Sequence, residues 1–479
     1  MSSSNDSGNA TSNSRLISTT GGDQQANTQL AATRATRNSS VSPVGASANN
    51  YSFASHAGDW FDQADSESVG AEAYKAALRI EGNDANGLSL YVHLPFCPSR
   101  CLTCDHATTV SHDHRQIDRY LDALETEVAL VAEGLASRRR LQQLHLGGGT
   151  PNYLTEVQLI RLVDMLDKHF VIDSDTETSL EANAHRASYA QLSLLHGLGF
   201  RNLHLEVRDL DKAVQEATGR HQSFPVVRDV IESARQLGFE RVSTDLVYGL
   251  PQQSLTSMRN TVEQLISLSP DRISCYRYHR RPETFGHQHA LDEGLMPSLA
   301  DKVAIFSRIV DGLCGAGYEW VGLDCFTRAD DDIVKAQQSG TLHRNRIGYT
   351  TQQGRDLIGL GSSSSSELSS IHVRNHAGIE AWTRSLEGGQ LPIEAGQQLT
   401  AEARARRRAL TDLMCNLRVN RTEIAANDSA GDAALKSLVE SGMVIEEGEH
   451  LHVTETGRLK LHQLWGDASP SFRWGKQAS

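Results

Sequence analysis

The chain has 479 residues, of which 39% are hydrophobic and 22% are charged, and its formal net charge at neutral pH is −13. A chain of this length exceeds one ordinary domain, so we expect two or three folded units. The negative charge argues against a general polyanion binder, and no apolar run is long enough to span a membrane. Because the N-terminus lacks the apolar core of a secretory signal, we expect a cytoplasmic protein.

The first part of the chain predicts two segments outside the main fold. Residues 1–50 are rich in Ser, Asn, Thr, Ala and Gly and show little periodicity, so we expect a disordered leader. We expect residues 51–87 to form a helical N-terminal extension.

From residue 88 to about 330, short apolar runs alternate with helical patterns. Thr155 with Gln158 resembles a capping box that opens one of the helices. Strands are predicted at residues 88–95, 142–146, 178–182, 202–207, 241–248, 272–278 and 320–325. Repeated strand–helix units predict an α/β fold with a parallel sheet, either an open or complete (β/α) barrel or a doubly wound sheet. In both architectures ligands bind at the carboxyl ends of the strands.

The C-terminal part predicts a connection and a smaller domain. We expect residues 331–395 to be a connecting segment at the substrate side of the barrel. Residues 396–479 predict a mainly helical, winged-helix-like domain, with elements at 404–417, 433–441, 443–446, 451–454 and from 456. Such units often bind DNA, but this one lacks a basic recognition helix, so we expect no nucleic-acid partner.

The strongest motif lies at the end of the first predicted strand and reads Tyr-Val-His-Leu-Pro-Phe-Cys-Pro-Ser-Arg-Cys-Leu-Thr-Cys over residues 91–104. The thiolates of Cys97, Cys101 and Cys104 can hold three irons of a [4Fe–4S] cubane and leave the fourth iron without a protein ligand. That iron can chelate the amino and carboxylate groups of S-adenosylmethionine. An electron passed into the sulfonium then releases a 5′-deoxyadenosyl radical.

Zinc is the alternative occupant, because the three cysteines with Asp105 or His106 could make a closed tetrahedral site. The segment Leu-Gly-Gly-Gly-Thr-Pro at residues 146–151 favours the cluster. Consecutive glycines let the backbone approach a ligand closely, with exposed N–H groups. The segment is no Walker loop, since no Lys-Ser/Thr pair follows. It lies one strand after the cysteines, where the amino group of bound S-adenosylmethionine is expected.

Two other strand ends carry carboxylates, Glu181 and Asp245. A carboxylate inside an apolar strand can be a satisfied structural group. Two of them at equivalent places in a barrel favour recognition of a ribose or an ammonium group. Arg220 follows a helical stretch, where a solvated arginine is the plainer interpretation.

With these motifs the chain resembles the oxygen-independent coproporphyrinogen III dehydrogenase (oxidase) family of radical S-adenosylmethionine enzymes. The similarity runs from about residue 71 to about residue 467. It is carried by the segments 91–104, 144–154, 199–209, 245–251, 269–272, 342–345 and 348–351. The resemblance implies a partial (β/α) radical-SAM barrel with a smaller C-terminal domain.

The resemblance also implies the chemistry. It places a [4Fe–4S] cluster on Cys97, Cys101 and Cys104. The matching S-adenosylmethionine contacts are Tyr91, Gly148, Gly149, Thr150, Glu181, Arg220 and Asp245. The tetrapyrrole substrate would lose carbon dioxide from two propionates, giving protoporphyrinogen IX from coproporphyrinogen III. A reduced donor such as flavodoxin or ferredoxin would supply the electron to a monomeric enzyme, and no residue is assigned as catalytic.

Five features depart from the family pattern. Thr103 stands where an aromatic residue is usual, and His106 follows where the family has an extra cysteine. Arg208 replaces a glutamine, and His279 replaces a small residue. The loop at residues 362–366 is all serine. Arg208 puts positive charge where the sulfonium is expected, which is unfavourable unless a nearby carboxylate such as Glu206 offsets it.

These departures leave two alternatives open. One is a paralogue with another radical reaction, such as methylation or haem degradation. The other is a non-catalytic haem-binding or trafficking protein, for which the candidate ligands are His279, His287 and His289. For the decarboxylase, the arginines that could bind propionates by paired hydrogen bonds are Arg280, Arg281 and Arg344.

Overall fold

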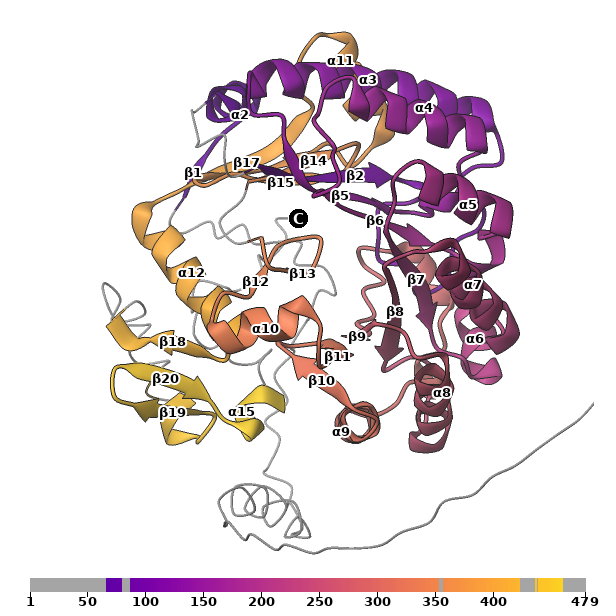
Figure 1. The fold of residues 1–479 in the computed structure, drawn as a ribbon, viewed down its shortest axis with the longest axis vertical. Coiled ribbons are helices and arrows are strands. Elements are labelled where there is room, and N and C mark those ends of the chain that lie inside the picture. The colour runs from indigo at the N-terminus through magenta and orange to yellow at the C-terminus, as the bar shows by residue number, and fades with distance from the viewer. Residues whose placement is uncertain (1–65, 80–86, 353–355, 423–435, 437, 460–479) are drawn as a thin grey trace, which may run out of the picture. The chain divides into compact units, whose positions relative to one another are not determined.

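The computed structural model describes residues 66–79, 87–352, 356–422, 436 and 438–459 (Figure 1). All of them belong to one unit, which spans residues 52–479. The expected leader lies outside the described residues, as does most of the expected N-terminal extension. Within the described part of the chain, no helix has the length and apolar character needed to cross a membrane.

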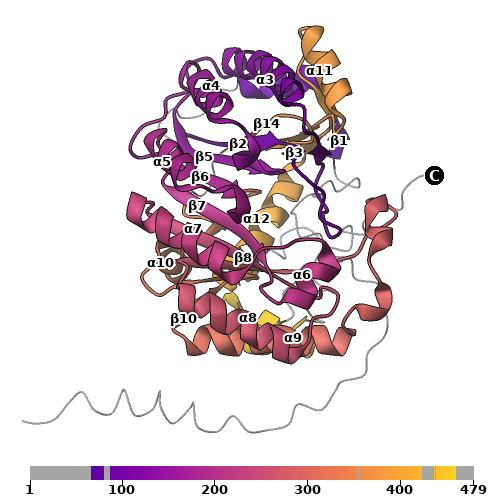
Figure 2. The ribbon, with the colours of Figure 1, turned by 90° about the vertical axis from the view of Figure 1, so that its right-hand side faces the viewer.

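Seven neighbouring parallel strands form the centre of one large mixed sheet, in the order β14-β2-β5-β6-β7-β8-β9. Their bounds are β14 Leu357–Leu360, β2 Leu88–Leu94, β5 Leu141–Gly148, β6 Glu177–Ala182, β7 Asn202–Arg208, β8 Arg241–Tyr248 and β9 Arg272–Arg277. The sheet curves, and helices lie along its outer side in Figures 1 and 2. This arrangement confirms the predicted partial (β/α) barrel.

The outer helices follow the strands in chain order. They are α3 His114–Leu135, α4 Glu156–Asp167, α5 Tyr189–Gly197, α6 Lys212–Thr218, α7 Phe224–Leu237, α8 Leu255–Leu268 and α9 Leu299–Gly315. The predicted capping box is confirmed: Thr155 accepts from Gln158 N, and the Gln158 side chain accepts from Thr155 N. Gly238 ends α7 in the left-handed region with φ +90°, where a residue without Cβ is favoured.

Both edges of the sheet differ from the sequence expectation. The predicted connecting segment, residues 331–395, contributes strands that extend the sheet antiparallel beyond β14. These edge strands are β15 Ser365–Glu367, β16 Ile371–Asn375 and β17 Ile393–Leu399. From the other end of the described chain, β1 Ser66–Ser68 pairs with β17, and α2 Ala71–Leu78 and α11 Ile379–Glu387 pack nearby. The predicted boundary after residue 395 therefore falls inside β17, because a polar edge strand carries little apolar signal.

The prediction of a single strand at residues 320–325 is also wrong. The chain turns at Gly322, whose φ is +56°, and the segment divides between two antiparallel strands. These are β10 Tyr318–Val321 and β11 Cys325–Arg328, which close the far edge next to β9. Further along lie α10 Asp332–Ser339 and a short hairpin, β12 His343–Arg344 with β13 Tyr349–Thr350.

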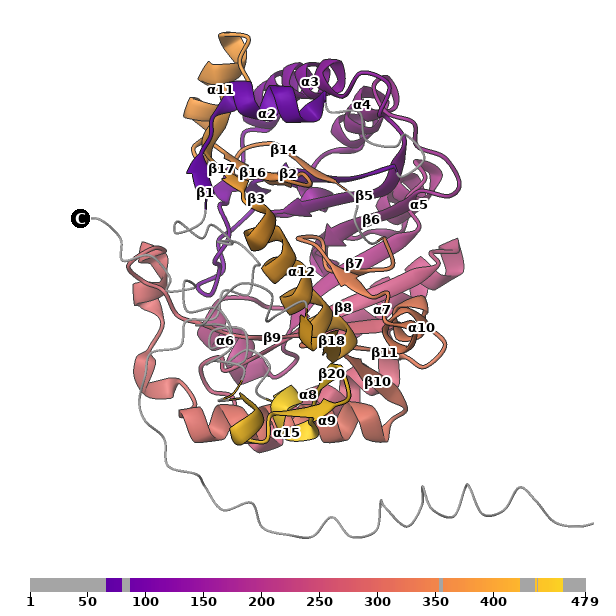
Figure 3. The same cartoon turned by 90° about the vertical axis from the view of Figure 1, so that its left-hand side faces the viewer.

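The C-terminal part holds a three-stranded antiparallel sheet and two described helices. Figure 3 shows α12 leading from β17 toward this small sheet. The elements are α12 Ala401–Asn416, β18 Arg418–Asn420, β19 Val444–Glu447, β20 His450–Val453 and α15 Glu455–Leu459. Five of the nine residues of the helix predicted at 433–441 are described, and four of them, 436 and 438–440, are helical. The remaining domain boundaries stay a prediction.

A buried carboxylate joins the first outer helix to the edge strands. Glu127 in α3 is only 1% exposed, and its two oxygens accept from Gly361 N at 2.7 Å, Asn375 Nδ2 at 2.5 Å and Trp382 Nε1 at 3.2 Å. Burial raises the pKa of Glu127 to about 7, although these donors oppose the shift. The native state therefore holds this proton more tightly than the unfolded chain.

This linkage predicts a pH-dependent stability. The contribution of Glu127 is fully present below its ordinary pKa of 4.5 and is lost as pH rises to about 7. Glu127→Gln should remove this dependence, a differential effect on the order of 3 kcal/mol between pH 4.5 and 7. Urea unfolding midpoints at several pH values measure it, with Glu133→Gln on the exposed side of the same helix as control. A parallel fall of stability in wild type and Glu127→Gln would contradict the assignment.

Candidate cluster and cofactor site

The cysteine loop is held at both of its ends. Phe96 and Cys97 form β3, which pairs in parallel with β4 (Thr109–Val110). The Phe96 ring is fully buried and meets Tyr120 edge to face, with the ring centroids 5.3 Å apart. In the middle of the loop, Leu102 N donates to Thr218 O at 3.0 Å. The loop is therefore fixed to α6 as well as to the end of β2.

All three cysteines line one cavity of about 660 Å³, which we call the cysteine cavity. Hydrogen-bond donors lie against two of them: Thr150 Oγ1 is 3.4 Å from Cys97 Sγ, and Arg220 Nη1 is 3.4 Å from Cys101 Sγ. Such donors stabilise thiolates and tune the potential of an iron–sulfur cluster. Cys104 is the most buried of the three.

The glycine segment packs against the cysteine loop backbone to backbone. Gly149 N donates to Leu94 O at 2.8 Å, and Thr150 N donates to Phe96 O at 3.0 Å. A Cβ added at Gly149 would lie 2.7 Å from Phe96 O, too close for any other residue. Gly148, with φ +113°, donates its N–H to a carboxylate oxygen. The expected exposed N–H groups are thus already paired, and the glycines serve this close approach.

The two predicted strand-end carboxylates are both in place. Glu181, near the end of β6, accepts from Gly148 N at 3.0 Å and lies 3.5 Å from His145 Nε2. Burial acts to raise the pKa of Glu181, but the hydrogen bond from His145 and the positive charge of its ring lower the pKa overall. Asp245 in β8 accepts from Arg208 N at 2.9 Å, and burial raises its pKa.

A bulge in β7 brings Arg208 to the site. The register between β7 and β8 shifts between Leu205 and Arg208, and Arg208 has φ +64°, which is uncommon for a side chain with Cβ. Its Nη2 pairs with Glu206 Oε1 at 3.3 Å. Glu206 Oε2 pairs on its other side with Arg220 Nη2 at 3.2 Å. Burial acts against ionisation of Glu206, but these two arginines lower its pKa overall.

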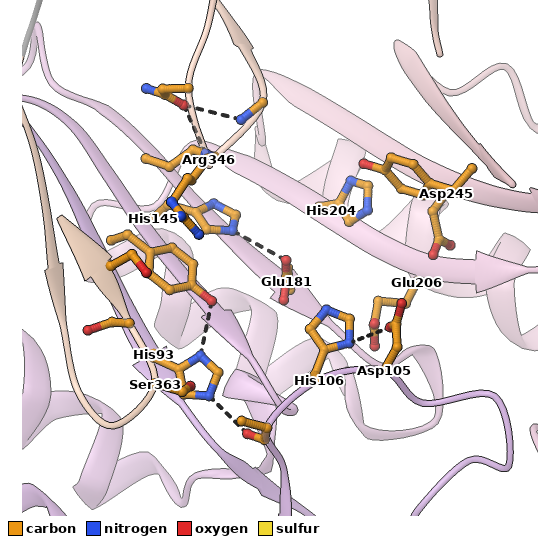
Figure 4. A pocket seen from close by; sticks show the side chains of 18 of the residues that line it. His93, Asp105, His106, His145, Glu181, His204, Glu206, Asp245, Arg346 and Ser363 are labelled. Atoms are coloured by element: carbon orange, nitrogen blue, oxygen red, sulfur yellow. Dashed lines mark hydrogen bonds and ion pairs between the residues drawn. The ribbon is translucent and has the colours of Figure 1, made fainter. Parts of the chain in front are cut away.

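A second cavity of about 340 Å³ lies next to the first, and we call it the arginine cavity. It shares three lining residues with the cysteine cavity: His106, Glu206 and Arg208. Figure 4 shows Glu181, Glu206 and Asp245 among the side chains around it. The predicted contacts divide between the cavities: the glycines, Thr150 and Arg220 line the first, whereas Tyr91, Glu181 and Asp245 line the second.

Three histidines on the inner face of the sheet were missed by the sequence prediction. One stands two residues after Tyr91 and another two residues before Glu206, a signal that strand periodicity could have given for these two. These histidines are His93, His145 and His204. Burial lowers the pKa of His93 to about 4, so its ring is neutral near neutral pH. His145 stacks on Tyr91, with the ring centroids 5.8 Å apart.

The residues predicted as haem ligands or propionate ligands are mostly elsewhere. His279, His287 and His289 line neither cavity. His287 Nε2 lies 2.8 Å from Cys104 O and so supports the cysteine loop. Of the three predicted arginines, only Arg344 lines the arginine cavity. Arg280 pairs instead with Glu293, and Arg281 lies 3.8 Å from Asp105.

The sequence and structure of this chain are similar to those of known proteins. The model of the radical SAM superfamily matches residues 91–265. The oxygen-independent coproporphyrinogen III oxidase of Pseudomonas aeruginosa is 33% identical over 408 residues, covering 83% of this chain and 89% of that protein. The Escherichia coli enzyme of that name is 33% identical over 407 residues, covering 83% and 88%. The solved structure of coproporphyrinogen III oxidase (HemN) from Escherichia coli superposes with a TM-score of 0.80 at 32% identity, over 84% of this chain and 93% of that one.

The chain belongs to the family of oxygen-independent coproporphyrinogen III oxidases. Membership in this radical SAM family implies a [4Fe–4S] cluster and S-adenosylmethionine, so the zinc alternative is set aside. The donor set fits such a cluster, because three thiols from one loop line one cavity and two of them receive hydrogen bonds. Which residues hold each cofactor remains a proposal.

Two of the departures from the family pattern touch each other. Arg208 Nη1 lies 3.4 Å from Thr103 Oγ1. The expected conflict with a sulfonium is offset, since the Arg208 guanidinium pairs with Glu206 and lies 3.9 Å from Asp245. Part of the serine loop, residues 363–365, lines the arginine cavity. Four of the five departures thus lie at the boundary between the cavities or in the arginine cavity, whereas His279 lines neither.

The cysteine assignment predicts a simple result. Cys101→Ser should lose most bound iron and sulfide after anaerobic reconstitution, because one cluster corner loses its thiolate. Cys314→Ser, an exposed cysteine in α9, is the matched control and should keep the full content. Iron and sulfide analysis with the visible absorbance spectrum measures both. Full cluster content in Cys101→Ser would contradict the assignment.

The charge balance at Arg208 predicts the effect of removing it. In Arg208→Gln, Glu206 keeps only its pair with Arg220, and Asp245 loses the nearby guanidinium. The boundary between the two cavities therefore becomes more negative. S-adenosylmethionine should then bind the reconstituted protein about three- to tenfold more tightly, because its sulfonium is positive. Equilibrium dialysis checks this, and Arg208→Lys should stay near wild type. Weaker binding in Arg208→Gln would mean that Arg208 is itself an attractive contact.

Proposed function

We propose that the chain catalyses the oxidative decarboxylation of two propionate side chains of coproporphyrinogen III, giving the vinyl groups of protoporphyrinogen IX in haem biosynthesis. One observation carries the proposal. A cavity rich in arginines adjoins the three-cysteine cavity and shares three lining residues with it, in a chain whose relatives bear the name coproporphyrinogen III oxidase over more than four fifths of its length.

The proposal assigns the cluster to Cys97, Cys101 and Cys104. The S-adenosylmethionine contacts would be Tyr91, Gly148, Gly149, Thr150, Glu181, Arg220 and Asp245. When bound, these cofactors supply a 5′-deoxyadenosyl radical. Since the N–H groups of the glycine segment are already paired, the glycines would shape the site. Glu181 and Asp245 are left to meet polar groups of the cofactor.

The protein's own side chains then do two things. The stacked Tyr91 and His145 rings and the neutral His93 form a wall of the arginine cavity next to Glu181. Such a wall excludes water from the place where a carbon radical must form. The arginines that line the same cavity attract carboxylates, which keeps the acidic side chains of the substrate oriented. We assign no residue as an acid or a base.

The reaction balance requires two electron partners. One electron is spent on each cleavage of S-adenosylmethionine, so a reduced protein such as flavodoxin or ferredoxin is the proposed donor. After loss of a hydrogen atom and carbon dioxide from a propionate, one electron remains on the substrate and passes to an acceptor. Exposed Arg100 and Arg186 line the cysteine cavity and would suit an acidic donor. We propose a cytoplasmic monomer with no nucleic-acid or membrane partner.

The test is an anaerobic turnover assay with the reconstituted full chain. With reductant, S-adenosylmethionine and coproporphyrinogen III, we expect 5′-deoxyadenosine and protoporphyrinogen IX in a ratio of two to one, since two propionates react. Reconstituted Cys101→Ser is the blank. 5′-Deoxyadenosine without the vinyl product would favour a paralogue with another radical reaction, which the Arg208–Thr103 contact makes the second candidate. No 5′-deoxyadenosine in the presence of a complete cluster would favour the haem-binding alternative.

A further inference from the structure

Two neighbouring side chains at the end of β9 carry polar atoms without a partner. Arg277 is the last residue of β9, and Tyr278 follows it. Arg277 Nε and Tyr278 Oη are both buried, and neither has a hydrogen-bond partner among the residues that the structure describes. Tyr278 is only 5% exposed. Both residues line the arginine cavity.

Arg277 differs from the other described arginines of the cavity in its ion pairing. Each of the others forms an ion pair with a carboxylate of the chain: Arg208 with Glu206, Arg344 with Asp324, Arg346 with Glu367 and Arg374 with Glu394. Within the described residues, Arg277 has no such ion pair. A partly buried cation without a counter-ion is costly, so the position is suited to an anion from outside the chain.

A second cation strengthens the positive field at this place. Lys302 in α9 lies close enough that burial and the positive charge of Arg277 together lower its pKa. No ion pair joins Lys302 to a carboxylate in the described part of the chain. The nearby carboxylate of Asp324 is already engaged by Arg344 at 3.2 Å. The end of β9 therefore carries positive charge that the protein does not compensate.

The backbone holds this pair of side chains firmly. Tyr278 N donates to Tyr248 O at 2.7 Å, which extends the pairing of β8 with β9 beyond the last residue of the strand. The Tyr278 ring packs in an apolar cluster with Val247 and Leu291. Only its hydroxyl remains for a ligand. A charged donor and a neutral donor that line one cavity and lack partners are both groups from which carboxylate oxygens can accept hydrogen bonds.

We propose that Arg277 and Tyr278 form a carboxylate subsite, which binds one acidic side chain of the substrate and so selects for substrates that carry one. The inference rests on the proposed function in one respect, namely that this side chain is a propionate of a tetrapyrrole. Arg277 and Tyr278 are specificity residues in this account. They take no part in cluster binding or in cleavage of S-adenosylmethionine.

The experiment measures binding of coproporphyrin III, the stable and fluorescent oxidised form with four carboxylates, to the reconstituted full chain by fluorescence titration. Arg277→Met keeps the length of the side chain and removes its charge, and should weaken binding about 10- to 100-fold. Arg277→Lys should recover much of this loss. Tyr278→Phe removes one neutral donor and should cost about three- to tenfold. Arg308→Met, an exposed arginine on α9, is the matched control and should bind like wild type.

Two further measurements distinguish the loss of the subsite from misfolding and from failure of the proposed function. Iron content should be unchanged in Arg277→Met, which reports an intact fold and cluster. With coproporphyrinogen III, the KM of this variant should rise more than its kcat falls. Equal affinity in wild type, Arg277→Met and Tyr278→Phe would overturn the subsite even if wild type makes the vinyl product. If wild type makes no vinyl product but Arg277→Met still loses affinity, the function fails and the subsite stands. A failure of wild type to bind coproporphyrin III would overturn the propionate assignment.

Discussion

The site depends on one close backbone contact, between the end of β2 and the end of β5. Gly149 and Thr150 donate their N–H groups to Leu94 and Phe96, at a separation that a Cβ at Gly149 would prevent. This contact fixes the start of the cysteine loop and brings Thr150 Oγ1 to Cys97. It also leaves Gly148 free to donate to Glu181 on the next strand. A single sheet register therefore positions thiols, a hydroxyl donor and a carboxylate together.

The second constraint is that the buried charges of the site must compensate one another. Two arginines and two carboxylates do so. Glu206 stands between Arg208 and Arg220, and Asp245 accepts the Arg208 backbone N–H that the bulge in β7 exposes. The positive φ of Arg208 is tolerated because this hydrogen bond and two carboxylates hold the residue in place. Burying any of these charges alone would be costly, so each one requires the others. The strained backbone and the compensated charge are parts of one arrangement.

The sequence predicted what local patterns encode. Apolar strands buried on both faces, helix caps and the cysteine spacing are short-range signals, and a parallel sheet and a three-thiol metal site followed from them. The choice of a partial barrel came from the family resemblance. The antiparallel edge at residues 365–399 did not, because its short and partly polar strands carry little apolar pattern. The orientation of the glycine N–H groups, and the unpaired state of Arg277, are likewise set by neighbours from other strands. His93 and His204 could have been found, since they alternate with Tyr91 and Glu206 along their strands.

The shared boundary between the two cavities explains why the departures in this chain concern the substrate more than the cluster. A radical formed from S-adenosylmethionine must act on a carbon within van der Waals reach, so the residues common to both cavities define where the two reactants can meet. His106, Glu206 and Arg208 are those residues, and Thr103 contacts the last of them. The sulfur ligands and their donors lie on the other side and keep the family pattern. The boundary residues, together with the uncompensated cation at the end of β9, therefore lie on the side of the site where we propose that the substrate binds.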